Sequence, residues 1–197
     1  MCVTTAFQSL NNAPHCGDAG AHWRFGNHIL LCLVDGLGHG KYAEQAAQAA
    51  INHVAYQRRE PIREIFSSCN ETIRNTRGVA MGLVLINVKN GELIHGGIGN
   101  IRALVVKEET THLGSDFGIV GGGYRSLSPD QLILERGDYV IMTTDGLVEI
   151  IDLNASKILD ENSFEMVADK ILRRWSHDRD DAGVLVYQFD PKHLKKE

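Results

Sequence analysis

The sequence contains no long apolar run and very little proline. No stretch approaches the roughly 18 uninterrupted apolar residues that a membrane-spanning helix requires. The first residues carry no basic segment followed by an apolar one, which argues against a secretory signal. Only 4 of the 197 residues are proline whereas 20 are glycine, a balance typical of many tight turns between strands. We therefore expect a cytoplasmic globular protein.

An excess of positive charge is also missing. The chain has 20 Lys and Arg against 25 Asp and Glu, a formal net charge of −5. Proteins that bind nucleic acid or anionic membranes obtain their affinity from clustered Lys and Arg. The charge balance therefore argues against both classes of partner.

The four cysteines show neither metal-binding nor redox spacing. None belongs to a C-x-x-C pair, and Cys32 lies within an apolar run where a free thiol is easily buried. The other thiols are Cys2, Cys16 and Cys69. This usage indicates four unrelated, reduced cysteines, as is normal in the cytoplasm.

The apolar pattern predicts an α+β protein with antiparallel hairpins and helices that cover the sheets. The run Ile29–Val34 is continuous, which is typical of a strand buried on both faces. Helices are expected at 41–58, from Pro61 to 75, and at 164–175 with Ser163 as its N-cap. Strands are expected at 3–9, 23–25, 28–34, 79–88, 92–96, 101–107, 131–135, 139–143 and 183–189, with turn-rich or glycine-rich loops at 11–20 and 118–123. We expect one domain over 1–190 and a short polar tail over 191–197.

Several aspartates stand at the ends of apolar strands. Asp35 and Asp145 each follow such a strand and precede a glycine, and Asp180 and Asp181 come just before the last strand. Asp18 lies in the first loop, between Gly17 and Ala19. Carboxylates gathered in a partly dry pocket repel one another, and a divalent cation such as Mg²⁺ or Mn²⁺ relieves that repulsion. Asp-Gly is also a common turn dipeptide, so each pair alone has a purely structural explanation.

A phosphate-binding loop of the P-loop type is not indicated. The segment from Gly36 to Lys41 is rich in glycine, but three residues instead of four separate Gly36 from Gly40. Tyr42 occupies the position of the Ser or Thr that would hold Mg²⁺.

Together these segments resemble the metal-dependent protein Ser/Thr phosphatases of the PPM type, in the bacterial SpoIIE-like branch. The matching segments, in the family's order, are 17–18, 34–40, 97–102, 137–138 leading to 144–149, and 180–186. The resemblance implies an α/β/β/α sandwich of two antiparallel sheets flanked by helices, with metal ions in a cleft at one edge. The short chain is most similar to the small, free-standing phosphatases of this branch that act on stressosome proteins.

The resemblance also implies roles for individual residues. Asp35 would bridge two Mn²⁺ or Mg²⁺ ions, Asp18 and the carbonyl of Gly36 would hold one of them, and Asp145 and Asp180 would hold the other. Asp181 is the less favoured ligand of the acidic pair. Asp35 and Asp145 would be catalytic through a metal-bound water that attacks phosphorus without a covalent enzyme intermediate.

The implied function is dephosphorylation of phosphoserine or phosphothreonine on stressosome-type (RsbR- and RsbS-like) or other sigma-regulatory proteins. The alternatives are a non-catalytic module that binds phosphoproteins, a phosphatase acting on an anti-sigma factor antagonist, and a hydrolase for small phosphoesters. The helices over 41–75 follow Asp35 directly, and the resemblance suggests that they gate metal binding; a purely structural packing role is the alternative.

The chain departs from the family pattern in three places. Leu37 occupies the position where many members have a histidine that protonates the leaving group, so the general acid is unassigned; His39 is more readily a structural residue of the loop. Gly183 replaces a usual threonine, which predicts weaker hydrogen bonding there. Arg24 and Arg102 are the candidates for gripping the substrate phosphate, although a solvated or structural role is expected for each.

Overall fold

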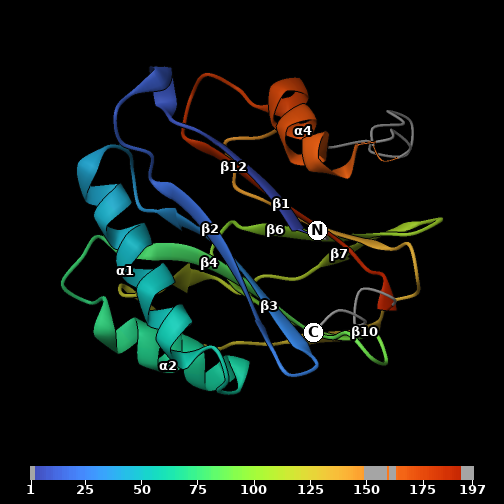
Figure 1. The fold of residues 1–197 in the computed structure, drawn as a ribbon. Coiled ribbons are helices and arrows are strands. Elements are labelled where there is room, and N and C mark those ends of the chain that lie inside the picture. Colours follow the sequence, from blue (N-terminus) through green and yellow to red (C-terminus); the bar gives the residue numbers. More distant parts are fainter. Residues whose placement is uncertain (1–2, 149–158, 160–162, 192–197) are drawn as a thin grey trace.

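The strands form two antiparallel sheets that pack face to face (Figure 1). The computed structural model describes residues 3–148, 159 and 163–191. The first sheet, here the β1 sheet, has the order β1 (Val3–Gln8), β12 (Ala182–Gln188), β11 (Tyr139–Thr143), β6 (Arg102–Val106) and β7 (Thr110–Leu113). The second, here the β3 sheet, has the order β10 (Asp130–Ile133), β5 (Glu92–Ile98), β4 (Val79–Asn87), β3 (His28–Gly36) and β2 (Asp18–Phe25).

Helices cover the outer face of each sheet (Figure 1). α1 (Lys41–Gln57) and α2 (Ile62–Thr72) pack on the β3 sheet, and α4 (Val167–Trp175) packs on the β1 sheet. The expected α+β class and α/β/β/α sandwich are thus confirmed. Four buried alanines of α1 (Ala43, Ala46, Ala47 and Ala50) carry only a methyl group, so this helix lies close to the strands beneath it.

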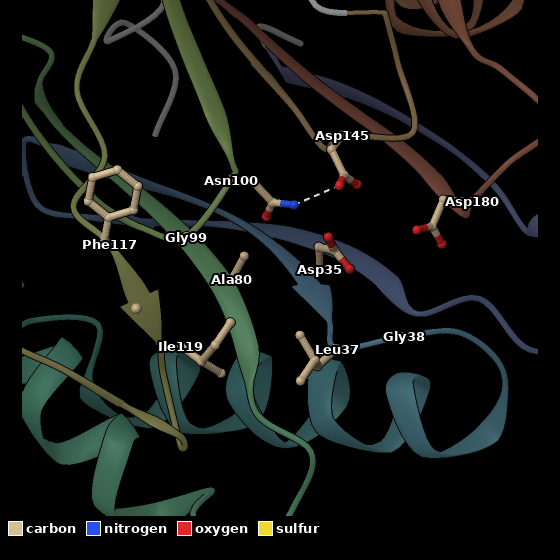
Figure 2. A pocket seen from close by; sticks show the side chains of 11 residues that line it. Asp35, Leu37, Gly38, Ala80, Gly99, Asn100, Phe117, Ile119, Asp145 and Asp180 are labelled. Carbon is tan, nitrogen blue, oxygen red and sulfur yellow. Dashed lines mark hydrogen bonds between the residues drawn. The ribbon is translucent and has the colours of Figure 1, made fainter.

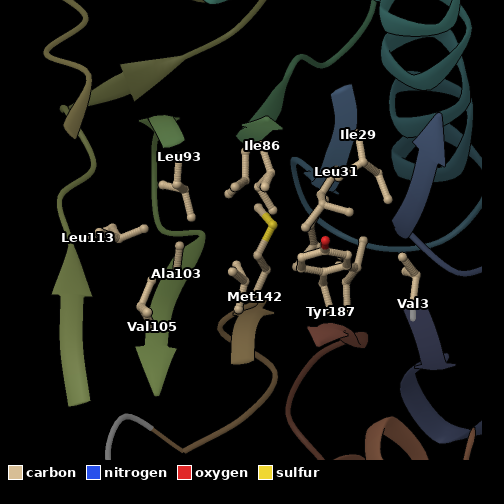
Figure 3. Close-up of a cluster of buried hydrophobic side chains, with 14 of the residues drawn as sticks. Val3, Ile29, Leu31, Ile86, Leu93, Ala103, Val105, Leu113, Met142 and Tyr187 are labelled. Atoms are coloured by element: carbon tan, nitrogen blue, oxygen red, sulfur yellow. The ribbon is translucent and has the colours of Figure 1, made fainter. Parts of the chain in front are cut away.

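The sequence of β3 is continuously apolar because both faces of the strand are buried. Ile29, Leu31 and Leu33 point into the core between the sheets, which Figure 3 shows with Leu31 near Tyr187 of β12. The intervening residues, Leu30, Cys32 and Val34, face α1 and α2. Each fully buried aliphatic side chain contributes about 1.5–3 kcal/mol, so both faces of this strand stabilise the sandwich.

β2 begins earlier than the sequence indicated. The glycine, proline and asparagine content of 11–20 predicts a loop, yet Asp18 to Gly20 already pair with β3, opposite Asp35 to Leu33. Without this pairing, the backbone N–H and C=O groups at the end of β3 that face β2 would lack hydrogen-bond partners from that strand. Gly20 serves here by leaving room for the ring of Phe7, since a Cβ at this position would lie 2.9 Å from Cζ of Phe7.

Three further strands were not expected. The glycine-rich stretch at 118–123 contains a two-stranded ribbon, β8 (Gly118–Ile119) paired with β9 (Gly123–Tyr124). β7 was missed because its first three residues are exposed and polar, as an edge strand permits.

Two helix starts also differ from prediction. Pro61 is the N-cap residue, with ψ of 144°, and α2 begins at Ile62. Ser163 makes no side-chain capping bond, and a 3-10 turn over Phe164–Met166 precedes α4. No helix in the described part of the chain is long and apolar enough to cross a membrane. Cys2, Glu149 and the expected tail beyond Pro191 lie outside the described residues.

Candidate metal centre

The hairpin of β2 and β3 brings two of the predicted site residues together. Asp18 and Asp35 are direct cross-strand partners in this hairpin, and Asp35 is flanked on its other side by Ala80 of β4. Directly opposed residues of an antiparallel pair have Cβ atoms about 4.5–5.5 Å apart. The pairing therefore places two carboxylates side by side at one end of the β3 sheet.

The β1 sheet supplies the other two aspartates. Asp145 follows β11 by two residues and Asp180 precedes β12 by two, and these strands are antiparallel neighbours. Asp35, Asp145 and Asp180 line one cleft of about 400 Å³ (Figure 2). Three carboxylates from distant parts of the chain thus meet at the edge where the two sheets come together.

The electrostatics of this cluster are unfavourable without a counter-charge. Burial raises the pKa of Asp35 above its ordinary value, and the charges of Asp145 and Asp180 raise it further. The pKa of Asp18 is also raised, first by burial and then by the charge of Asp35. Burial is likewise the main cause of the raised pKa of Asp180.

Such a donor set suits a hard divalent cation. Carboxylate oxygens are the ligands that Mg²⁺ and Mn²⁺ prefer, and the added charge removes the repulsion that raises these pKa values. As they stand, no three His, Cys, Asp or Glu side chains within the described residues form a ready-made metal cage. The carboxylates nevertheless fit a hard cation in charge and in the kind of donor atom.

Asp181 has a different environment from its neighbour. Its side chain is buried, and its two carboxylate oxygens accept 2.7 Å hydrogen bonds from the backbone N–H groups of Leu10 and Gly17. Its own N–H donates to Oδ1 of Asp180 at 2.8 Å. Asp181 therefore ties loops together beside the cleft; the choice of Asp180 as the metal ligand of the pair stays a prediction.

A hydrogen-bond chain joins the two sheets behind the cleft. Oγ1 of Thr144 donates to Oδ2 of Asp18 at 2.7 Å and accepts the N–H of Gly183 at 2.8 Å. The backbone N–H of Gly183 thus has a hydroxyl partner in Thr144; weaker hydrogen bonding than with a threonine at position 183 stays a prediction. A Cβ at Gly183 would lie 2.9 Å from the Phe7 ring, so this site has little room for a side chain.

The loop that carries Asp145 is held from several directions. Nδ2 of Asn100 donates to Oδ2 of Asp145 at 2.7 Å, and Nε2 of His177 bonds the Asp145 carbonyl at 3.0 Å (Figure 2 shows the former). No role is predicted from the sequence for Asn100 or His177. The signals for Asn100 were its place in a Gly-Asn turn after a strand and in the segment 97–102, which matches the family pattern.

The two arginines considered for phosphate binding do not point to that role. The guanidinium of Arg102 donates to the carbonyls of Thr144, Leu147 and Val148 at 2.6–2.9 Å, so it clamps the Asp145 loop. Arg24 is six residues from Asp18 along β2, or about 20 Å at strand rise. Arg77, which the sequence did not single out, lies beside the cleft. Its Nη1 is 3.5 Å from the carbonyl oxygen of Leu37, a residue of the cleft wall.

The glycines that follow Asp35 and Asp145 are needed for close packing. A Cβ on Gly36 would collide with the backbone carbonyl of Ala43 in α1, and one on Gly146 would collide with the carbonyl of Asp181. Glycine thus lets helix and loop backbones approach the aspartates directly. The expected ligand role of the Gly36 carbonyl stays a prediction.

Comparison with known proteins agrees with this arrangement. Residues 26–190 match the family described as Stage II sporulation protein E (SpoIIE). The phosphoserine phosphatase RsbX of Bacillus subtilis (strain 168) is 24% identical over 179 residues, which cover 88% of this chain and 87% of RsbX.

Solved structures share the fold. One, from work on the bacterial stressosome as a modular system adapted to control secondary messenger signalling, has a TM-score of 0.89 at 24% identity and covers 95% of this chain and 98% of its own. A crystal structure of RsbX in complex with magnesium has a TM-score of 0.83 at 22% identity and covers 95% and 94%. Since the family match spans most of the sequence, the chain belongs to the SpoIIE family of PP2C-type serine/threonine protein phosphatases.

Proposed function

We propose that this phosphatase uses two Mn²⁺ or Mg²⁺ ions to dephosphorylate phosphoserine or phosphothreonine on signalling proteins of the stressosome or sigma-regulatory type. The observation that carries the proposal is the meeting of Asp35, Asp145 and Asp180 in one cleft, from three separate segments. These carboxylates repel one another in the partly buried cleft, and bound divalent cations would relieve that repulsion.

The proposed ligands divide between the two sheets. Asp35 would contribute to both ions; Asp18 and the Gly36 carbonyl would hold one of them, and Asp145 and Asp180 would hold the other. Two bound cations supply Lewis acidity, which lowers the pKa of water and neutralises phosphoryl charge. Asp35 and Asp145 are thus the proposed catalytic residues of the site.

The chain's own contribution is to hold these groups in position. Thr144 fixes the carboxylate of Asp18 through its hydroxyl, and Asn100 fixes that of Asp145 through its amide. Because these hydrogen bonds already orient the carboxylates, the groups do not have to be reoriented in each catalytic cycle. Besides Asn100 and the three carboxylates, the described lining of the cleft is glycine and apolar side chains.

The proposed substrate class rests on the relatives. RsbX is a phosphoserine phosphatase, and the structure from the stressosome work covers nearly the whole chain. A phosphorylated stressosome-type protein is therefore the favoured partner, and an anti-sigma factor antagonist is the second candidate.

The test is hydrolysis of a phosphoserine peptide with and without Mn²⁺. We expect hydrolysis that depends on the cation and that Asp35→Asn lowers by at least about a hundredfold, because a bridging carboxylate is lost. Asp169→Asn is the matched control, since Asp169 pairs with Arg173 on the surface of α4 and should retain full activity. Full activity of Asp35→Asn, or in excess chelator, would refute the metal mechanism. Peptide binding without turnover in the unaltered protein would favour the non-catalytic module.

A further inference from the structure

Phe117 is an unusual residue on the wall of the cleft. Its side chain is 96% exposed, the highest value among the large apolar residues of the described chain. Figure 2 shows it on the side of the cleft away from Asp180, on the segment that also carries Ile119. An exposed phenyl ring keeps a large apolar area in water, which is unfavourable unless something covers it.

The loop that carries Phe117 is firmly anchored. The N–H of Asp116 donates to the Gly97 carbonyl, and the N–H of Gly99 donates to the Asp116 carbonyl, both at 2.9 Å. The Asp116 carboxylate also accepts the N–H of Ser128. On the other side, Gly118 pairs with Tyr124 in the β8–β9 ribbon. The anchored backbone therefore fixes the position from which the ring projects, so less loop entropy is lost when a ligand covers the ring.

The surroundings of the cleft select the kind of side chain that Phe117 can meet. Leu37, half exposed, lies on the wall formed by the loop after β3, and Ala80 and Ile119 add apolar surface. No Lys or Arg is among the described lining residues, and the three carboxylates disfavour an acidic side chain nearby. An apolar substrate residue therefore fits this rim better than an acidic one.

We propose that Phe117 contacts an apolar side chain of the substrate protein within two residues of the phosphoserine, and so helps to select the site of dephosphorylation. This inference rests on the proposed function, since it assigns the flanking sequence that the same cleft prefers. The covered ring would act as an aromatic anchor of the kind that dominates many protein interfaces.

The test uses synthetic phosphoserine peptides in Mn²⁺. One peptide has glycine on both sides of phosphoserine, and four others carry a single leucine at −2, −1, +1 or +2. In the unaltered protein we expect kcat/KM for at least one leucine peptide to exceed that of the glycine peptide by about tenfold, the usual order for an aromatic anchor. In Phe117→Ala this ratio should fall to near one. Tyr56→Ala is the matched control, because Tyr56 is an aromatic residue of α1 that is 83% exposed. Tyr42 lies at the start of α1, the end next to the cleft loop, and Tyr56 is fourteen residues further, or about 21 Å along the helix. The control variant should keep the ratio.

Three results would overturn the inference. They are no leucine preference in the unaltered protein, a preference that persists in Phe117→Ala, and concentration-dependent dimerisation that Phe117→Ala abolishes, which would assign the ring to contact between copies. Failure of the proposed function is a distinct result, namely no hydrolysis of any peptide with Mn²⁺. Thermal melting of both variants establishes that they are folded.

Discussion

The hydroxyl of Thr144 donates a 2.7 Å hydrogen bond to the carboxylate of Asp18, and this bond crosses from one sheet to the other. Thr144 follows β11 in the β1 sheet, whereas Asp18 opens β2 in the β3 sheet. Both side chains are buried, so water cannot replace the bond if either partner is lost.

We expect Thr144→Val to lower the free energy of unfolding by about 1–3 kcal/mol. The substitution keeps the shape but leaves the Asp18 carboxylate and the Gly183 N–H without their shared hydroxyl. Urea unfolding monitored by circular dichroism measures the effect. Thr72→Val is the control, because the Thr72 hydroxyl bonds a carbonyl on the exposed side of α2. Equal losses in the two variants would contradict the buried inter-sheet bond.

Replacement of Arg102 by methionine tests the clamp on the Asp145 loop. Three carbonyl groups lose a charged donor, so we expect a loss of about 2–3 kcal/mol of stability and weaker Mn²⁺ binding in calorimetry. The control is Arg173→Met, which breaks an exposed ion pair with Asp169 and should change stability by less than about 1 kcal/mol. If Arg102 instead gripped phosphate, its loss would raise KM while stability stayed unchanged.

Substitutions of the neighbouring aspartates Asp180 and Asp181 should have different effects, one on metal affinity and the other on stability. Asp181→Asn replaces one of two acceptor oxygens by an NH₂ group that faces a backbone N–H, so unfolding should become easier by about 1–3 kcal/mol. Asp180→Asn should weaken Mn²⁺ affinity with little effect on stability in the metal-free protein. A strong loss of Mn²⁺ affinity in Asp181→Asn at unchanged stability would reverse this assignment.

A buried histidine predicts a specific pH dependence of stability. His95 is fully buried, and neither ring nitrogen has a hydrogen-bond partner in the described structure. Burial lowers its pKa to about 4, with Asp130 opposing the shift. The unfolded chain takes up this proton below about pH 6.5 whereas the folded protein resists until about pH 4, so stability is full above pH 6.5 and falls as the pH drops through this window. The loss at pH 4.5 is about 2–3 kcal/mol.

The raised pKa values of Asp18 and Asp35 act in the opposite direction, since their folded forms bind protons more readily. The comparison of wild-type protein with His95→Leu isolates the histidine contribution. Urea unfolding at pH 7.5 and pH 4.5 should show that the variant lacks the acid-dependent loss assigned to His95. The same pH dependence in both proteins would show that His95 is not its source.

The α+β class and the strand-terminal aspartates follow from local patterns in the sequence, whereas the sandwich and the ligand set were implied by the resemblance to the PPM-type phosphatases. The apolar run of β3 and the Asp-Gly at its end specify a buried strand whose last residue emerges at the sheet edge. The residues around Asp18 favour turns and predict a loop; only pairing with β3 makes Asp18 part of a strand. The clamp by Arg102 was not predictable, because its partners lie 42–46 residues away and depend on the register of β6 and β11.

Because the acidic cluster is built from both sheets, metal binding there would also stabilise the packing of one sheet on the other. Asp18 and Asp35 come from one layer, while Asp145 and Asp180 come from the other. In the proposed ligand set, the ion held by Asp35, Asp145 and Asp180 would join the two layers, so separation of the layers at this rim would release that ion. At a free ion concentration of about 100 times Kd, such binding would stabilise the folded protein by about 2.7 kcal/mol.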